Sequence, residues 1–439
     1  MKNHYLLPGK ILALAALLLL CALCAFAQET KPGIDTGDTS WVMMSAALVL
    51  LMTPGVGLFY GGMVRKKNVV SILIQSFVII AVISLQWVFY GYTLSFGPDM
   101  GGLIGGLKFL GLSGVGIDPN TEYAATIPHI VFMLFQMMFA IITPALIIGA
   151  FTDRIKFSTM LVFVLLWSTL VYDPVAHWMW GAGGFLKNMG ALDFAGGIVV
   201  HITAGVSALA AAIVIGKRKG YGEGNMVPHN VPMMILGGAI LWFGWFGFNA
   251  GSALGANGIA ANAFLVTNTA GAAAAISWML ISWAHMGRPN AVGIVTGAVV
   301  GLATITPAAG YVGVMDSVVI GALASVVSYT AMYLKNKYTK IDDSLDVFAC
   351  HGLGGTFGAL AIGIFASKAV NSAGADGLLH GNANLLGIQL AAVALTWVYS
   401  FVVTYLLFKV LDATMGLRVT TEEELVGLDL SQHGETAYT

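Results

Sequence analysis

The sequence predicts an all-α integral membrane protein with about eleven transmembrane helices. Three observations predict this fold: 58% of the 439 residues are hydrophobic, only 9% are charged, and apolar runs long enough to cross a bilayer follow one another along the chain. A soluble domain carries about 25% charged residues, so this chain has too few charges to cover a soluble surface. Its 55 glycines suit helices whose backbones approach closely in lipid. The net charge of −1 gives no indication of a nucleic-acid partner.

Each apolar run has at least the length of a membrane span, which is about 17–25 residues. The runs follow one another closely along the chain. The expected spans are 41–63, 69–96, 128–150, 157–180, 194–216, 231–254, 259–284, 291–309, 314–334, 347–366 and 388–411.

The N-terminus has the pattern of a cleavable signal peptide. Lys2 and Lys10 form a basic start, residues 11–20 form an apolar core, and Ala25 and Ala27 flank Phe26 in a small-x-small cleavage site. The alternative is an uncleaved signal anchor, which would add a twelfth helix. The apolar run is short for a span, and this favours cleavage.

The expected organisation has four parts, which follow from the leader and the spans. They are a signal peptide at 1–27, an extracytoplasmic segment at 28–40, a transmembrane domain at 41–415 and a cytosolic regulatory tail at 416–439. Two of the three cysteines lie in the leader, which leaves Cys350 alone in the remainder. We therefore expect no internal disulfide, no thiol metal site and no cofactor.

The distribution of basic residues sets the orientation, because Lys and Arg concentrate in cytoplasmic loops. If the mature N-terminus is outside, fourteen basic residues fall on the inner side and only four on the outer side. The bias predicts an N-out, C-in topology with an odd number of spans. We expect a multi-pass protein of the inner (plasma) membrane. Spans one to five and six to ten would then be inverted repeats, which place a functional site between the halves at the bilayer midplane.

Two histidines occupy the paired spans of this predicted repeat. His201 lies in the fifth span and His351 in the tenth, each expected near the middle or inner half of its span. A lone histidine in a membrane is often only a hydrogen bond between helices, but two at matching positions favour a shared site.

Asp193 opens the fifth span and has two interpretations. As a residue at a helix start it can cap free backbone N–H groups, and this is the favoured one from sequence alone. The alternative is direct contact with a substrate.

Aromatic side chains gather at the outer ends of spans three, four and six, where they form either an interfacial belt or a vestibule that attracts a small cation through its ring faces.

The chain carries no Walker loop, GxSxG, HExxH or paired-carboxylate motif. We therefore do not expect an enzyme, and transport would be passive or driven by an ion gradient.

The sequence resembles the bacterial Amt branch of the ammonium transporter family, over essentially the whole mature chain. The order and spacing of the matching stretches carry the resemblance. These stretches are 54–62, 191–197, 244–252, 346–352, 422–429 and 433–435.

The resemblance implies a homotrimer with one pore in each subunit. It implies an outer recruitment site of Phe135, Trp180 and Ser252 with the acid Asp193 nearby. It also implies a gate of two stacked rings, a twin-histidine pore, and a tryptophan beside the second histidine. The gate would be Phe139 and Phe248, and the pore histidines would be His201 and His351. The tryptophan would be Trp245.

A mechanism follows from the cost of moving a bare cation through an apolar pore, which is of order 20 kcal/mol in the Born limit. Cation–π contacts offset only about 0.5–2 kcal/mol each. Ammonium would therefore bind outside, lose its proton near the gate and cross as ammonia along the histidines. Separate passage of the proton would make transport electrogenic. The alternatives are an ammonium sensor with little transport and a gas or water channel.

The C-terminal tail resembles tails that bind a PII-type regulator, whereas its composition alone also fits a solvated acidic tail.

Overall fold

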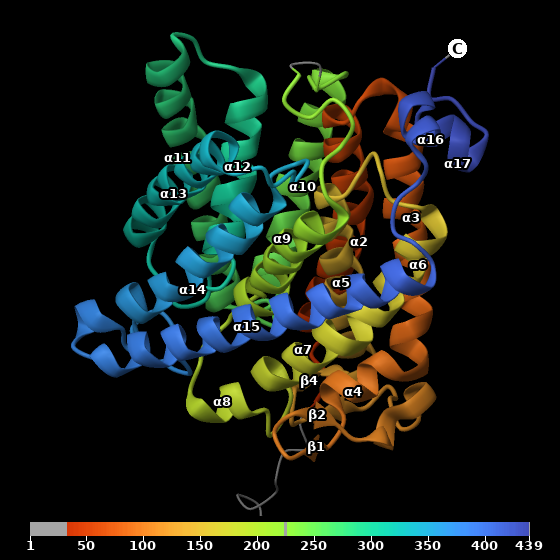
Figure 1. Ribbon diagram of the computed structural model, residues 1–439. Helices are drawn as coiled ribbons and strands as arrows, with labels where there is room; N and C mark the ends of the chain where they lie inside the picture. The colour runs from red at the N-terminus through yellow and green to blue at the C-terminus, as the bar shows by residue number, and fades with distance from the viewer. Residues whose placement is uncertain (1–32, 224–225, 439) are drawn as a thin grey trace, which may run out of the picture.

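The computed structural model describes residues 33–223 and 226–438, so the predicted signal peptide lies outside the described residues. Long helices run between a face with two small β-hairpins and an opposite face with the C-terminal helices (Figure 1). The bias of basic residues assigns the second face to the inside of the cell.

The eleven predicted spans are confirmed. Among the described residues, ten helices are long and apolar enough to cross a membrane, and α12 is a shorter apolar helix. The spans consist, in order, of α2 (Thr36–Met63); η1 (Lys66–Asn68), α3 (Val69–Gln86), η2 (Trp87–Gly91) and α4 (Tyr92–Phe96); α5 (His129–Ile147) and η4 (Ile148–Ala150); α6 (Phe157–Trp167), η5 (Ser168–Tyr172) and α7 (Asp173–Trp180); η6 (Gly197–Ile202) and α9 (Thr203–Ile215); α10 (Val231–Gly251); α11 (Gly258–Met286); α12 (Ala291–Ile305); α13 (Val314–Tyr338); η7 (Phe348–Leu353) and α14 (Gly354–Phe365); and α15 (Ala383–Thr414).

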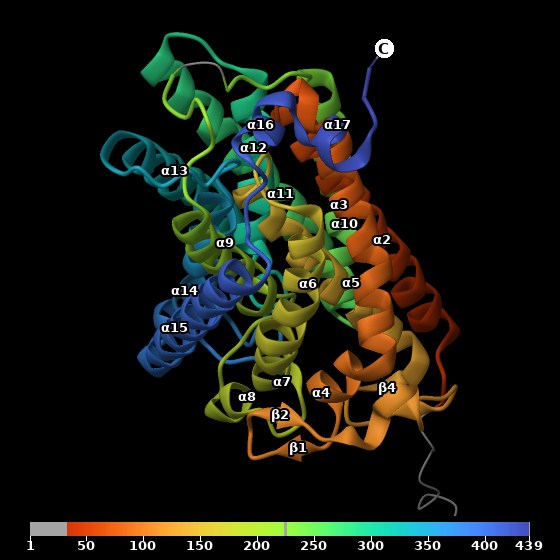
Figure 2. The same cartoon turned by 45° about the vertical axis from the view of Figure 1, so that its right-hand side comes forward.

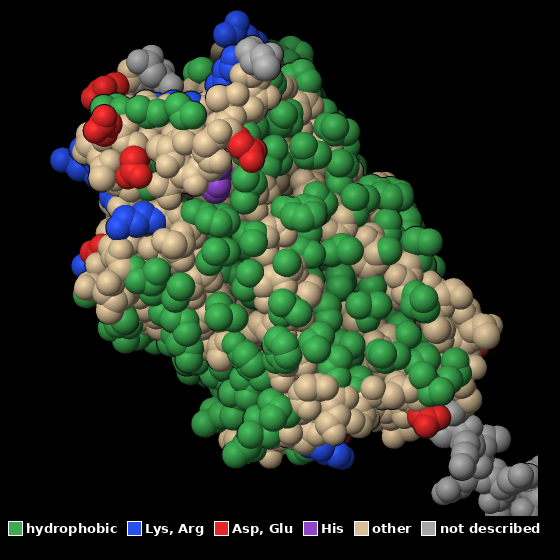
Figure 3. Space-filling view, turned by 90° about the vertical axis from the view of Figure 1, so that its right-hand side faces the viewer, with side chains coloured by type: hydrophobic (Ala, Val, Ile, Leu, Met, Phe, Trp, Pro, Cys, Tyr) green, Lys and Arg blue, Asp and Glu red, His purple; other side chains and the backbone are tan. Residues whose placement is uncertain are grey.

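The surface has the polarity of a membrane protein. Figure 3 shows hydrophobic side chains over the whole middle of one face, with charged side chains gathered toward its ends. Phe77, Phe89 and Val398 are each more than half exposed on the outside of the bundle. Such exposure is stable when the surrounding solvent is lipid.

Short elements close the outer face. The strands β1 (Asp99–Met100) and β2 (Ile104–Gly105) form one antiparallel pair, and β3 (Pro119–Asn120) and β4 (Ala124–Pro128) form another. The short helices at the same face are η3 (Leu107–Leu112), α8 (Phe185–Met189) and η8 (Leu378–His380).

Spans two, four, five and ten each contain a π-helical turn, η2, η5, η6 and η7 respectively. A π turn inserts an extra residue into a helix and is frequent at functional sites. The turns η6 and η7 begin the two spans that the predicted repeat relates, and each contains one histidine. His201 is the fifth residue of the continuous helix η6–α9, and His351 is the fourth residue of η7–α14, so each histidine lies near the start of its helix. The extra residue of the π turn left no trace in the hydrophobic pattern.

Spans five and ten touch through their backbones. A Cβ atom at Gly205 would lie 2.0 Å from the backbone nitrogen of Gly352, the residue after His351. Only a residue without a side chain permits this approach. The contact holds the two histidine-bearing segments together.

Arg154 fixes the inner ends of the same spans. Its guanidinium is fully buried and donates to the carbonyls of Ala150, Gly216 and Asp342, which end span three, end span five and precede span ten. Asp342 in turn accepts two hydrogen bonds from the guanidinium of Arg218, with distances of 2.9 and 2.8 Å.

The C-terminal tail lies on the inner face, where α16 (Thr421–Val426) and α17 (Leu428–His433) sit beside the start of span two (Figures 1 and 2). Asp429 accepts a hydrogen bond from the backbone of Ser71 at 2.8 Å, and Asn68 accepts one from Leu428 at 2.8 Å. The tail is therefore docked on the helical bundle.

Candidate functional site

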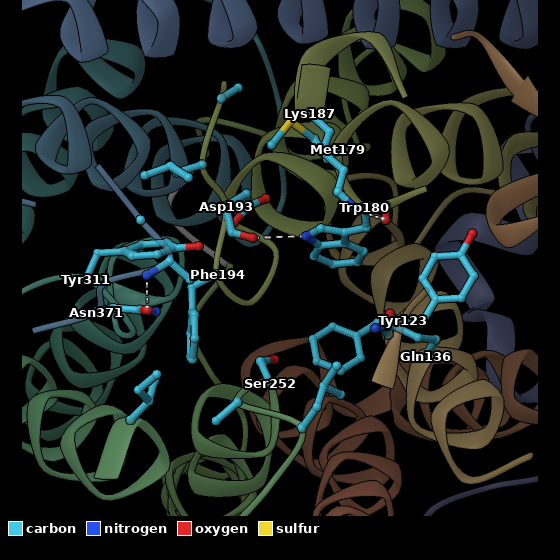
Figure 4. Close-up of a pocket in the computed structure, with 18 of the residues that line it drawn as sticks. Tyr123, Gln136, Met179, Trp180, Lys187, Asp193, Phe194, Ser252, Tyr311 and Asn371 are labelled. Atoms are coloured by element: carbon cyan, nitrogen blue, oxygen red, sulfur yellow. Dashed lines mark hydrogen bonds between the residues drawn. The ribbon is translucent and has the colours of Figure 1, made fainter. Parts of the chain in front are cut away.

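A large cavity opens at the outer face between spans three, four, five and six. It has a volume of about 660 Å³, and Trp180, Ser252 and Asp193 all line it (Figure 4). The Ser252 hydroxyl donates to the Phe248 carbonyl at 2.9 Å, so its oxygen lone pairs remain free to accept a hydrogen bond. The cavity thus joins aromatic faces to an oxygen acceptor, a combination that suits a small cation with N–H groups.

Phe135 does not line this cavity. Its side chain is fully buried and lies behind Phe139, with the two ring centroids 4.9 Å apart in an edge-to-face arrangement. Neighbouring positions Phe132 and Gln136 line the cavity instead. Of the three residues expected to form the recruitment site, the structure brings together Trp180 and Ser252.

Two phenylalanines close the bottom of the outer cavity. The rings of Phe139 and Phe248 have centroids 4.3 Å apart and planes inclined at 43°, so they are tilted rather than parallel. Phe139 lines the outer cavity and Phe248 lines a smaller cavity beneath it. The pair separates the two spaces.

The smaller cavity contains both histidines. It leaves about 20 Å³ for the centres of water-sized molecules, which is room for about one. Its other walls are apolar or aromatic and include Val56, Phe59 and Leu241. A third cavity of about 390 Å³ continues from His351 toward the inner face. The three spaces form a row from the outer face to the inner face.

The two histidines are in direct contact. Their Nδ1 atoms lie 3.2 Å apart, and their ring centroids are 5.2 Å apart with nearly parallel planes. One Nδ1 must therefore carry a proton and the other must present a lone pair.

The hydrogen bonds of Thr306 determine which of the two Nδ1 atoms carries the proton when both histidine rings are neutral. Its hydroxyl donates to the Leu302 carbonyl at 2.8 Å, so it can only accept from Nε2 of His201, which lies 3.4 Å away. His201 then presents a lone pair at Nδ1, and Nδ1 of His351 donates to it. Nε2 of His351 remains as an acceptor.

Trp245 lies against His201 and lines the small cavity that also contains His351. The ring centroids of Trp245 and His201 are 5.6 Å apart, and the indole N–H donates to Thr306 at 2.9 Å. Sequence analysis missed Thr306, because one threonine in an apolar span commonly bonds only to its own helix.

Asp193 is saturated by backbone amides. One carboxylate oxygen accepts from Gly196 and Gly197 at 2.9 and 2.7 Å, and the other accepts from Ile198 and Val199 at 2.7 and 3.0 Å. All four donors belong to the start of η6, so the capping interpretation has a complete geometry. The backbone carbonyl of Asp193 accepts a hydrogen bond from the Trp180 indole N–H at 2.9 Å (Figure 4).

Comparison with known proteins identifies the family. Residues 40–438 match the model of the Ammonium Transporter Family. The chain belongs to the ammonium transporter family. An ammonium transporter of Bacillus subtilis is 51% identical over 92% of this chain and 99% of its own length. Ammonium transporter Amt1 of Archaeoglobus fulgidus is 52% identical over 92% of this chain and 100% of its own length.

Solved structures of the ammonium transporter family share the fold. Mep2 of Candida albicans has a TM-score of 0.85 at 37% identity and covers 94% of this chain and 93% of its own. A structure named Sensor Amt Protein has a TM-score of 0.83 at 33% identity and covers 90% of this chain and 98% of its own. Among the described residues, no group of three His, Cys, Asp or Glu side chains is arranged to hold a metal ion.

Proposed function

We propose that this protein transports ammonium across the plasma membrane through a twin-histidine pore. The observation that carries the proposal is the contact between His201 and His351 inside a small cavity, in line with a larger cavity on each side. Membership of the ammonium transporter family supports ammonium as the substrate.

Recruitment takes place in the outer cavity. The ring of Trp180 and the free lone pairs of Ser252 bind ammonium as a cation, and Phe135 acts by supporting Phe139 from behind. Asp193 contributes by fixing the turn that carries His201 and by adding negative charge beside the cavity.

Deprotonation takes place before the small cavity. The space below Phe139 and Phe248 has apolar walls, and burial of an ion there without a partner is far more costly than burial of a neutral amine. Ammonia, by contrast, can donate to Nε2 of His351 and pass along the histidine rings. The proton crosses separately through the histidine pair or through water, which makes transport electrogenic.

Selectivity follows from the same chemistry. Potassium has no proton to lose and no N–H group to donate, so it cannot enter the small cavity as a neutral species. Proteoliposomes containing the protein should give a current under an ammonium gradient, a smaller one with methylammonium and none with potassium. Equal currents with potassium would contradict the proposal, as would ammonium binding without any current.

A second candidate is an ammonium sensor with little transport. The similarity to the structure named Sensor Amt Protein favours it, and the tail would then signal through a partner. The current measurement separates the two functions. A gas or water channel would need no cation site, so the Trp180–Ser252 cavity argues against that function.

The remaining assignments are also proposals. Residues 1–27 are a cleaved leader, 28–40 an extracytoplasmic segment, 41–415 the transporter domain and 416–439 a regulatory tail. The protein is not an enzyme, and it forms a homotrimer.

A PII-type regulator binds the inner face, and a pull-down with and without the residues after Met415 tests this. Retained binding after that truncation would place the regulator elsewhere.

A further inference from the structure

Lys187 brings a positive charge to the rim of the cation-recruiting cavity. It lies in α8 and lines the outer cavity beside Met179 and Trp180 (Figure 4). Its Nζ donates a hydrogen bond to the backbone carbonyl of Trp180 at 3.2 Å. A protonated lysine is itself an alkylammonium ion, so the rim already holds a cation of the same chemistry as the proposed substrate.

The chain folds back sharply to make this contact. Gly183 has φ of +90°, a conformation that L-residues with side chains rarely adopt. A Cβ atom at Gly184 would lie 2.0 Å from the His177 carbonyl, so the loop packs directly on the preceding helix. The backbone N–H of Phe185 then donates to the Gly102 carbonyl at 3.1 Å, which anchors α8 beside the cavity.

The carbonyl that Lys187 occupies has the properties of a cation site. Trp180 is the last residue of α7, and carbonyls at a helix C-terminus carry negative partial charge and attract cations. Trp180 also contributes the ring of the proposed recruitment site. The nearby carboxylate of Asp193 does not neutralise Lys187 by hydrogen bonding, because backbone amides occupy both of its oxygens.

We propose that Lys187 is a tethered ammonium group that competes with substrate at the outer cavity and thereby sets the apparent affinity of the transporter. The inference rests on the proposed function, since it assigns a competitor to the same recruitment site. Two effects act together. The lysine charge raises the energy of a second cation in the cavity, and its N–H groups occupy a carbonyl that free ammonium would otherwise use.

Three substitutions separate these effects. Lys187→Met removes the charge and the donor, Lys187→Gln removes the charge and keeps a donor, and Lys187→Arg keeps both. Apparent KM and maximal ammonium current are measured in proteoliposomes at ionic strengths of about 0.01 M and about 1 M, between which the Debye length falls from about 30 to about 3 Å. Glu122→Gln, which removes a negative charge from the same cavity, is the matched control.

At low ionic strength, Lys187→Met should lower KM about two- to fivefold, the size of a partly exposed charge interaction. Lys187→Gln should lower KM less, Lys187→Arg should match the original protein, and Glu122→Gln should raise KM. Maximal current should change little in each case, and the differences should shrink at high ionic strength because salt screens exposed charges.

An unchanged or raised KM in Lys187→Met would overturn the inference. A fall in maximal current alone would do so too, because it would show that Lys187 only positions Trp180. If the unsubstituted protein gives no ammonium current, the proposed transport fails, yet the inference is still tested by binding. Methylammonium should then raise the unfolding temperature of purified Lys187→Met at lower concentrations than for the original protein, and equal concentrations would reject it.

Discussion

The Nδ1 atoms of His201 and His351 lie 3.2 Å apart, although the two residues are 150 positions apart in the sequence. They come from spans that run in opposite directions, and each occupies a π turn at the start of its span. The contact of His201 with Thr306 defines which nitrogen donates between the two neutral rings. The contact couples the two rings, so a change at either ring removes a hydrogen-bond partner of the other.

Replacing either histidine by alanine should reduce ammonium current by about tenfold, roughly the effect of losing one hydrogen bond in a buried site. The same variants should admit potassium, because the enlarged cavity can hold water around an ion. Currents in proteoliposomes with each cation measure both effects. The control is His380→Ala, an exposed histidine in η8 that lines none of the three cavities. Full selectivity in both pore variants would contradict the proposed mechanism.

Thr306→Val should weaken both transport and stability. The substitution removes the acceptor for the indole of Trp245 and for Nε2 of His201, and each buried donor left unpaired costs about 1–3 kcal/mol. Thermal unfolding in detergent and ammonium current provide the two measurements. Thr306→Ser keeps the hydroxyl and should retain most of both. Equal behaviour of the two variants would show that the hydroxyl does not orient His201.

Asp193→Asn should disrupt the turn that carries His201. The amide oxygen can replace one carboxylate oxygen, but the NH₂ group then faces two backbone donors, at a cost of about 1–3 kcal/mol for each donor left unpaired. Both the unfolding temperature and the current should fall. Asp316→Asn is the control, since Asp316 accepts one backbone N–H at the start of α13. Normal stability with lost current would favour direct contact between Asp193 and substrate.

The inner clamp between Arg218 and Asp342 should make stability depend on acid pH. Burial by itself would raise the pKa of the Asp342 carboxyl, but the hydrogen bonds and charge of Arg218 and the charge of Arg154 outweigh burial and hold that pKa below its usual range. A lowered pKa in the folded state gives stability that is present above the unfolded value of about 3.9 and is lost as pH falls through the folded value.

Asp342→Asn tests this dependence. It should lower the unfolding temperature at neutral pH, because breaking a buried pair costs about 3–5 kcal/mol, and it should reduce the loss of stability below about pH 4. Unfolding in detergent between neutral and acid pH measures both. Glu223→Gln, at an exposed position on the inner side, should leave the pH profile unchanged. An identical profile in Asp342→Asn would mean that other carboxyls control acid stability.

The spans could be predicted from sequence because each is a continuous apolar run, and lipid requires such runs whatever their partners. Even the eighth span, α12, was recognisable although it has only 15 residues. The π turns could not be predicted, because a shift in backbone hydrogen bonding leaves no mark on composition.

The candidate site was predicted in its aromatic and histidine members but not in their contacts. Phe135 and Phe139 share a helical face, and the pattern alone does not show which ring meets the cavity. The pattern likewise does not show that Trp245 packs on the ring of His201. Asp193 remained ambiguous until its four amide donors were seen, and the role of Thr306 depends on distances across the bundle.

The backbone contact between Gly205 and Gly352 has a consequence for how the protein moves. Helices that meet without side chains between them cannot slide or hinge apart without opening an empty gap in a dry interior, which is energetically costly. Large rocking motions of one half against the other are therefore opposed. In the proposed pathway, passage past Phe139 and Phe248 therefore requires rotation of single rings, and such motions occur far faster than domain rearrangements.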